Sequence, residues 1–239
     1  MHKTNSPSLK KNLLIVGAVV ALILLIDQII KIYVKTHFEP SFGDEETPLL
    51  GRWFVMQYIE NQGMAFGTTF GDTKWHKLAL SIFRIVAIVA ICYYWYKQAK
   101  AGVKTEFLIA LGLVLAGATG NLIDSMFYDY LFPINKCLPW NHLDSQSANC
   151  DAPLRHTGFL MGNVVDMFKF QANWPSWVPW LGGKEVFPAI WNFADASISI
   201  GVAMIFIRQK KYFPDKKTKK QKNEEKVNVE SSEAEQIID

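Results

Sequence analysis

The sequence lacks the motifs of the common metal and nucleophile sites. Its five histidines include no HExxH pattern or paired spacing, and its three cysteines include no CxxC pattern. Metal sites need such clusters of ligands, so the sequence predicts no metal and no other cofactor. It also has no GxSxG nucleophile elbow and no phosphate-binding loop, which excludes the usual serine hydrolases and P-loop nucleotidases.

Long apolar runs, by contrast, are abundant. Four of them cover residues 13–34, 77–96, 106–124 and 188–207, and a hydrocarbon core of about 30 Å requires roughly 20 residues of helix. A soluble domain of 239 residues could bury one or two such helices, whereas four favour a membrane. The sequence therefore predicts an α-helical integral membrane protein with four transmembrane helices.

The distribution of Lys and Arg orients this predicted bundle. No small-x-small cleavage site follows the first span at Tyr33, so we interpret that span as a retained helix and not as a signal peptide. Three basic clusters fall on one side of the bundle, and the positive-inside rule assigns that side to the cytoplasm. The clusters are Lys3, Lys10 and Lys11; Lys97, Lys100 and Lys104; and Arg208, Lys210 and Lys211. Both termini are then cytoplasmic, and outer loops 35–76 and 125–187 face outward.

We expect one membrane domain over residues 1–207 and a charged tail over 208–239. The tail has almost no aromatic residues and many charges of both signs, which is typical of disorder. Its basic part could alternatively touch anionic lipid. The net charge of +3 comes largely from this tail and the cytoplasmic loops, so it does not predict a nucleic-acid partner.

The two outer segments differ in composition. Residues 53–59 are rich in aromatic and β-branched residues, which predicts a small extracytoplasmic β-sheet at the membrane surface. The second segment is an extended outer loop that contains Trp174, Trp177 and Trp180. Tryptophan prefers the headgroup level, so these side chains are expected to anchor the loop there; a specific contact with a substrate is the alternative.

Several polar residues interrupt the spans. Asp27 and Lys31 are one helical turn apart, so they share a face and are predicted to form a structural pair. On the fourth span, Asn192 and Asp195 are also predicted to share a helix face, with Asp195 roughly 8–10 Å inside the outer boundary at about 1.5 Å per residue. Asn121 on the third span can hydrogen-bond across the bundle, beside glycines that allow close helix packing.

Asp166 and Asp195 each lie in apolar sequence at a predicted membrane boundary. A carboxylate is costly there, so it is by default a functional-site hypothesis. Two neighbouring carboxylates in a low-dielectric site share one proton, and one member can act as base and the other as acid. Such a pair activates water for attack on a carbonyl without a metal. The alternative for each aspartate is a buried carboxylate with a structural partner.

Five motifs resemble, in order and placement, those of the bacterial lipoprotein (type II) signal peptidases: DQxxK at 27–31, NQGMAF at 61–66, GATGNLID at 117–124, GNVVDMF at 162–168 and WNFAD at 191–195. The resemblance implies an intramembrane aspartic endopeptidase of the bacterial inner membrane, with its active site near the outer face. Its implied substrates are diacylglyceryl-modified prolipoproteins, cut immediately before the lipidated cysteine. The expected partners are these substrates and membrane lipid, and we expect a monomer.

By resemblance, the catalytic residues are Asp166 and Asp195. The residues expected to bind substrate or shape the site are Asn61, Gly63, Asn121, Asp124 and Asn192. The sequence departs from the family pattern at Ser125, where the family usually has an arginine. About thirty extra residues separate Asp124 from Asp166, and Arg84 in the second span has no assigned role.

Two other functions remain open from the sequence. A small transporter or channel subunit could use Asp27, Asp124 and Asp195 as an ion path. A non-catalytic assembly factor of the membrane would tolerate replacement of Asp195 by asparagine.

The outer loop also contains Cys137 and Cys150, whereas Cys92 lies within the second span. The two loop cysteines share a compartment that can be oxidising, so we predict a disulfide between them. Two free thiols in a mobile loop are the alternative.

Overall fold

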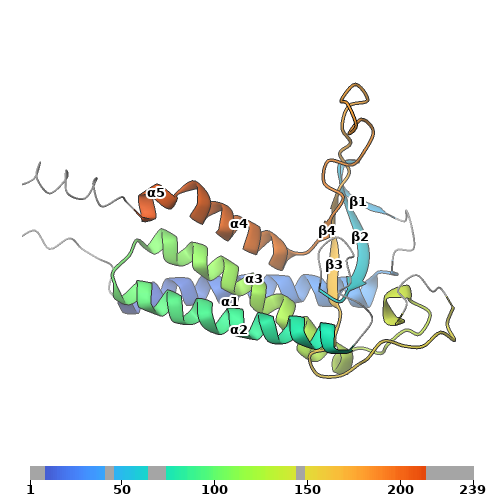
Figure 1. The fold of residues 1–239 in the computed structure, drawn as a ribbon, viewed down its shortest axis with the longest axis horizontal. Coiled ribbons are helices and arrows are strands. Elements are labelled where there is room, and N and C mark those ends of the chain that lie inside the picture. Colours follow the sequence, from blue (N-terminus) through green and yellow to red (C-terminus); the bar gives the residue numbers. More distant parts are fainter. Residues whose placement is uncertain (1–8, 41–45, 64–73, 144–148, 214–239) are drawn as a thin grey trace, which may run out of the picture.

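The main elements of the described part of the chain are four apolar helices and a small sheet (Figure 1). The structure is a computed structural model that describes residues 9–40, 46–63, 74–143 and 149–213. Three helices are long and apolar enough to cross a membrane: α1 (Leu9–His37), α2 (Lys74–Lys100) and α3 (Thr105–Leu131). The fourth, α4 (Phe193–Ile207), has 15 residues. The predicted helical membrane fold is therefore confirmed, with three long spans and a shorter one.

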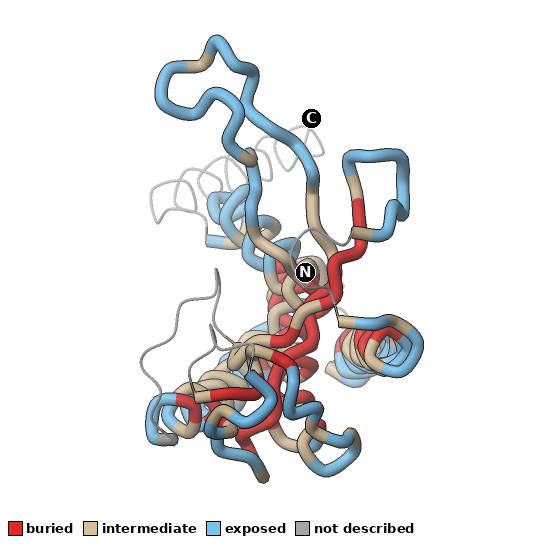
Figure 2. Tube along the Cα trace, turned by 90° about the vertical axis from the view of Figure 1, so that its right-hand side faces the viewer, coloured by how far each residue is buried: buried red, intermediate tan, exposed pale blue. Residues whose placement is uncertain are grey.

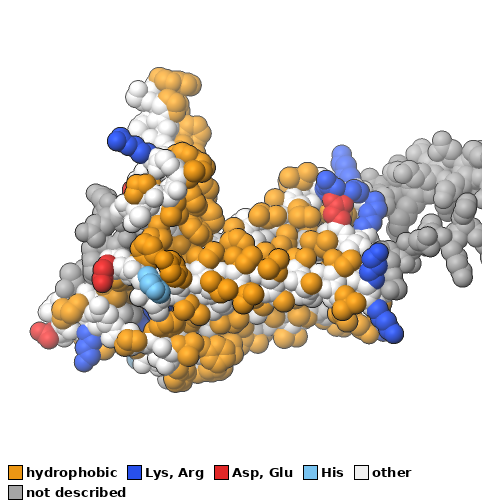
Figure 3. All heavy atoms as spheres, turned by 180° about the vertical axis from the view of Figure 1, so that it is seen from behind, with side chains coloured by type: hydrophobic (Ala, Val, Ile, Leu, Met, Phe, Trp, Pro, Cys, Tyr) orange, Lys and Arg blue, Asp and Glu red, His pale blue; other side chains and the backbone are white. Residues whose placement is uncertain are grey.

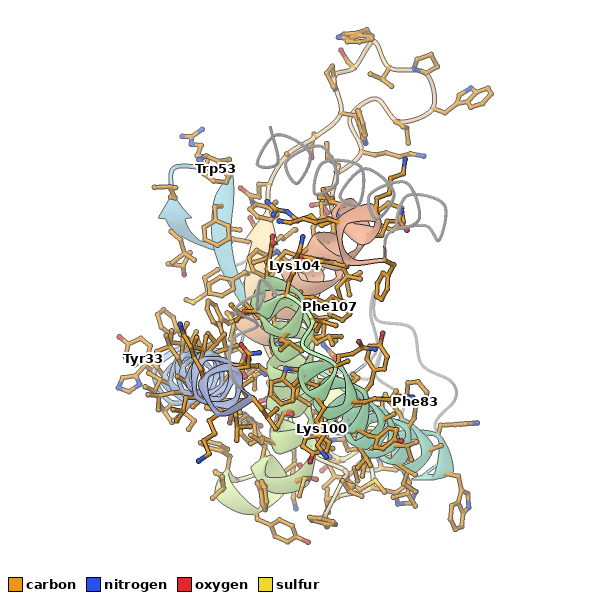
Figure 4. The ribbon with its side chains drawn as sticks, turned by 90° about the vertical axis from the view of Figure 1, so that its left-hand side faces the viewer. Tyr33, Trp53, Phe83, Lys100, Lys104 and Phe107 are labelled. Carbon is orange, nitrogen blue, oxygen red and sulfur yellow. A yellow bond between two sulfur atoms is a disulfide. The ribbon has the colours of Figure 1, made fainter. Side chains whose placement is uncertain are left out.

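The helix surfaces are suited to lipid. Large apolar side chains on the outside of the bundle stay exposed, among them Tyr33 on α1 and Phe83 on α2, which point away from the other helices (Figure 4). Helix α3 lies at the centre and packs against α1, α2 and α4. Gly117 and Gly120 allow this packing, because an added Cβ would lie 2.2 Å from the Ala194 carbonyl oxygen and 2.6 Å from Asp27 Oδ2, respectively. The predicted close helix packing is thus confirmed.

An antiparallel sheet lies across one end of the bundle (Figure 1). Its strands, in spatial order, are β1 (Thr47–Leu50), β2 (Phe54–Asn61), β3 (Val164–Phe170) and β4 (Ile190–Trp191). The strand predicted near residues 53–59 is confirmed as β2. The GNVVDMF segment was expected to be a loop and is instead β3. Its first four residues are all buried, so it lacks the alternation of buried and exposed residues that marks a half-buried strand.

The helix boundaries differ most from the prediction at the end of α3 and at the start of α4. Helix α3 continues to Leu131, seven residues beyond the predicted end at 124, because Asp124 and Asp129 are paired with Lys31 and Arg155 and not solvated. Helix α4 begins at Phe193 and not at 188, because 190–191 belong to the sheet. Asn192 is the N-cap of α4 and not a residue inside the helix as predicted, although it does lie beside Asp195, through a capping box.

The segment predicted to be a disordered tail begins with structure. A short helix, α5, covers Gln209–Tyr212. Arg208, which precedes this helix, and Lys211, which lies within it, both form ion pairs with Glu106 of α3. Residues 214–239 lie outside the described residues.

The long outer loop after α3 is held by two links. A disulfide joins Cys137 and Cys150, as predicted, and Cys92 is free and exposed. A buried bidentate pair joins the Arg155 guanidinium to Asp129, with nitrogen–oxygen distances of 3.0 and 2.7 Å. A short 3-10 helix, η2 (Pro139–Asn141), lies between the two cysteines in the sequence.

Replacing both Cys137 and Cys150 by alanine is expected to lower the free energy of unfolding by about 3 kcal/mol, because a loop closed across 13 residues restricts the unfolded chain. Thermal unfolding in detergent measures the loss, with Cys92→Ala as the control. Mass spectrometry of unreduced, alkylated protein tests the bond itself. Alkylation of both loop cysteines would contradict it.

Residues 171–189, which connect β3 to β4, form an arm that extends beyond the sheet (Figure 1). It is exposed along most of its length (Figure 2), and Trp177 and Trp180 are 80% and 92% exposed. The Lys169 ammonium holds its base through ion pairs with Glu46 and Glu185, both at 3.0 Å. The arm therefore starts from a fixed point on β3.

Candidate active site

Two aspartates meet where the sheet joins α4. Asp166 lies in β3 opposite Ile59 of β2 and is 5% exposed. Asp195 lies in the first turn of α4 and is half-buried. Burial raises the pKa of Asp166 well above its usual range, and the negative charge of Asp195 raises it further. The two carboxylates are thus close enough to titrate as a pair.

Asn192 joins the two aspartates. Its side-chain oxygen accepts a hydrogen bond from the Asp195 N–H at 2.9 Å, and its Nδ2 donates to Asp166 Oδ1 at 2.6 Å. Asp195 Oδ2 in turn accepts from the Asn192 N–H at 3.3 Å, which completes a capping box. Because the cap fixes the orientation of the Asn192 amide, this side chain offers Asp166 a donor and not an acceptor.

Asn61 approaches Asp166 from the opposite side. It ends β2, and its Nδ2 donates a hydrogen bond to Asp166 Oδ2. Its oxygen accepts from the Gly63 N–H at 2.6 Å, which fixes the amide orientation here as well. Gly63 has a φ of 90°, a conformation that glycine adopts without strain. Residues 64–66 of the same predicted motif lie outside the described residues.

Asn121 on α3 contacts the other aspartate. Its Nδ2 donates to Asp195 Oδ1 at 2.8 Å, and its oxygen accepts from Lys31 Nζ at 2.9 Å and Asn192 Nδ2 at 3.1 Å. Three asparagines therefore surround the two carboxylates with amide donors, as expected for residues that shape the site.

Behind Asn121 lies a buried cluster of three charges. Lys31 Nζ is 3.0 Å from Asp27 Oδ2 and 2.8 Å from Asp124 Oδ2, and all three side chains are at most 1% exposed. Asp27 Oδ1 also accepts from the Ala194 N–H at 2.9 Å. Asp27 and Lys31 are in contact, as the helical spacing predicts, and Lys31 also pairs with Asp124. The cluster joins α1 and α3 to the start of α4, and so positions Asn121 and Asp195.

Two basic residues of α2 lie at the edge of this site. Arg84 Nη2 donates to the Gly63 carbonyl at 2.7 Å, and Lys77 Nζ donates to the Gln62 carbonyl at 2.8 Å. The sequence did not predict Lys77 as a site residue. The signal was present, because Lys77 and Arg84 are seven residues, or about two helical turns, apart and so share one face of α2.

A family model and curated relatives both match this chain, and both indicate the same family. The family model described as "Signal peptidase (SPase) II" matches residues 19–210. A lipoprotein signal peptidase of Porphyromonas gingivalis is 37% identical, over 81% of this chain and 81% of its own. One of Amoebophilus asiaticus is 35% identical, over 78% of this chain and 73% of its own.

The fold also matches that of a solved protein. A structure of a bacterial membrane enzyme aligns with 84% of this chain and 90% of its own, with a TM-score of 0.55 at 21% sequence identity. The family model and the relatives together show that the chain belongs to the lipoprotein signal peptidase family, the type II signal peptidases. These enzymes are aspartic peptidases that cleave the signal peptides of prolipoproteins.

Proposed function

We propose that Asp166 and Asp195 are the catalytic pair, and that they hydrolyse the peptide bond immediately before the lipid-modified cysteine of a diacylglyceryl-modified prolipoprotein. The observation that carries this proposal is the arrangement around Asn192, which contacts both aspartates. A carboxylate pair surrounded by amide donors is suited to share one proton across a reacting carbonyl.

We assign the shared proton to Asp166, because burial and the nearby charge of Asp195 both raise the pKa of its carboxyl. Asp195 then takes a proton from the attacking water, while Asp166 hydrogen-bonds the scissile carbonyl and later helps to protonate the leaving amine.

The ion-path alternative fits the contacts less well. Asp27 and Asp124, which it would require as carriers, are both ion-paired with Lys31 and at most 1% exposed. A charge held in such a cluster is a structural link and a poor relay, since moving it would leave its partner buried and unpaired.

We place the active site near the outer face of the bacterial inner membrane, with the start of α1 and the end of α4 at the cytoplasmic face. Figure 3 supports this orientation, because Lys and Arg side chains gather at the end of the bundle opposite the sheet. Figure 3 also shows that hydrophobic side chains cover the side of the arm that faces the helix bundle. Trp177 and Trp180 in that arm would then lie at headgroup level, with the lipid chains of the substrate in the bilayer beside the helices.

We further propose that residues 1–207 form the peptidase domain and that it works as a monomer, since the aspartates and the asparagines that contact them come from one chain.

The test uses purified protein in lipid vesicles with two forms of one prolipoprotein. One form carries the diacylglyceryl group on its cysteine; the other has serine at that position and cannot be lipidated. We expect a size shift for the lipidated form alone and an N-terminal cysteine on the released product. Equal cleavage of both forms, or ion flux without cleavage, would contradict the proposal.

A further inference from the structure

The chain departs from the family pattern at position 125, and side chains of the neighbouring helix α2 lie beside this position. Ser125 is fully buried on α3, and its Oγ donates to the Asn121 carbonyl at 3.2 Å. The same oxygen accepts from Arg84 Nη1 at 3.3 Å and from Lys77 Nζ at 3.4 Å, both on α2. Positive charge is therefore present beside position 125, although the residue there is a serine.

The Arg84 guanidinium continues from Ser125 to the loop after β2. Its Nη2 donates to the Gly63 carbonyl at 2.7 Å, and a Cβ added to Gly63 would lie 2.5 Å from that nitrogen. The Gly63 N–H holds the Asn61 oxygen, and Asn61 Nδ2 donates to Asp166. A continuous chain of contacts thus runs from Arg84 through Gly63 and Asn61 to Asp166.

The charge of Arg84 also acts on the aspartates directly. Attractive electrostatic interactions link it to Asp195, Asp124 and Asp166, with Asp195 the strongest of the three. Asp124 has Lys31 as its own cation at 2.8 Å, whereas the hydrogen-bond partners described for Asp166 are the uncharged amides of Asn61 and Asn192. Arg84 therefore supplies positive charge to the aspartate pair from α2, in addition to the charge of Lys31 on α1, which also acts on Asp166.

We propose that Arg84 is a positioning residue of this peptidase: it replaces, from the neighbouring helix, the arginine expected at position 125, and it holds Gly63 and Asn61 against Asp166. The inference rests on the proposed function of the aspartate pair. An arginine suits this position because its planar guanidinium donates to the Gly63 carbonyl from one nitrogen and to Ser125 from another, an arrangement that a single nitrogen at the end of a lysine side chain at position 84 would not reproduce. A second arginine at 125 would face Arg84 and Lys77, so the two arrangements exclude each other.

The first test replaces Arg84 by leucine and measures steady-state cleavage of the lipidated prolipoprotein. We expect kcat to fall by about tenfold to a hundredfold, since a displacement of roughly 1 Å at a reacting group has effects of that size, with KM changed by less than the fall in kcat. Arg84→Lys keeps the charge but not both contacts and should lie between the leucine variant and the parent. The matched control is Phe83→Leu on the lipid-facing side of α2, where Phe83 is 68% exposed (Figure 4); it should retain full activity.

The second test moves the arginine. Ser125→Arg in the Arg84→Leu background should recover about tenfold in kcat, because the guanidinium returns to the same space from α3. Parental kcat in Arg84→Leu would overturn the inference, as would a folded double variant no more active than Arg84→Leu. If the double variant does not fold, Arg84→Lys decides: activity no higher than that of Arg84→Leu overturns the inference. Inactive Asp166→Asn together with fully active Arg84→Leu would overturn it while leaving the proposed aspartate pair intact.

Discussion

Replacement of Asp166 or Asp195 by asparagine is expected to lower kcat by about a thousandfold or more, near the upper range for loss of a general acid or base. Neither variant can share a proton as the pair does, so one aspartate does not substitute for the other. In Asp166→Asn there is a further reason. Asn61 and Asn192 both present Nδ2 to this side chain, and an asparagine amide would set its own NH₂ group against one of these donors.

The double variant provides the sharper test of the pair. Residues that act as a unit are not additive, so Asp166→Asn/Asp195→Asn should be no less active than either single variant. Asp151→Asn is the matched control, because Asp151 is an exposed aspartate in the outer loop between α3 and β3. This variant should leave kcat unchanged. Substantial turnover by either single variant would contradict the assignment of the catalytic pair.

Replacement of Lys31 by methionine is expected to have the largest effect on stability. It keeps most of the apolar stem but leaves Asp27 and Asp124 buried without their cation. Breaking a buried ion pair in this way costs about 3–5 kcal/mol. It also removes the donor that holds the Asn121 oxygen, so activity should fall with stability. Thermal and denaturant unfolding in detergent, followed by tryptophan fluorescence, measures the first effect.

Two further variants show whether charge is the cause. Lys10→Met changes an exposed lysine on the same helix and should alter the free energy of unfolding by no more than about 0.5 kcal/mol. Adding Asp124→Asn to Lys31→Met removes one of the two uncompensated charges and should restore part of the lost stability. An unfolding midpoint of Lys31→Met equal to that of the parent would show that the cluster does not support the bundle.

Much of the site could be predicted because its parts are local in the sequence. Asp27 and Lys31 are one turn apart, so the helical period alone brought them together. Asp166 and Asp195 were predicted to be functional because a carboxylate in apolar sequence is costly and therefore informative. Their motif order indicated the family, and the separation of Cys137 and Cys150 from Cys92 by compartment gave the disulfide.

The roles of Asn192 and β3 could not be predicted in this way. Asn192 was expected inside a helix, yet it is the N-cap and faces Asp166 in the sheet. Its position depends on β4, a strand of two residues that exists only because it pairs with β3. A strand that short has no periodicity of its own, so nothing local distinguishes it from the start of a helix.

Hydropathy, charge and motif order are properties of contiguous residues, so the sequence established the membrane class and predicted the orientation and the two aspartates of the proposed pair. Which side chains meet depends on the tertiary structure: Asn61 and Asp166 are 105 residues apart, and Arg84 and Ser125 are 41 apart. Hydrogen bonds act over about 3 Å, so contacts across such separations depend on how the helices and the sheet pack. For that reason Ser125 and Arg84, unexplained as separate residues in the sequence, form one interaction in the folded protein.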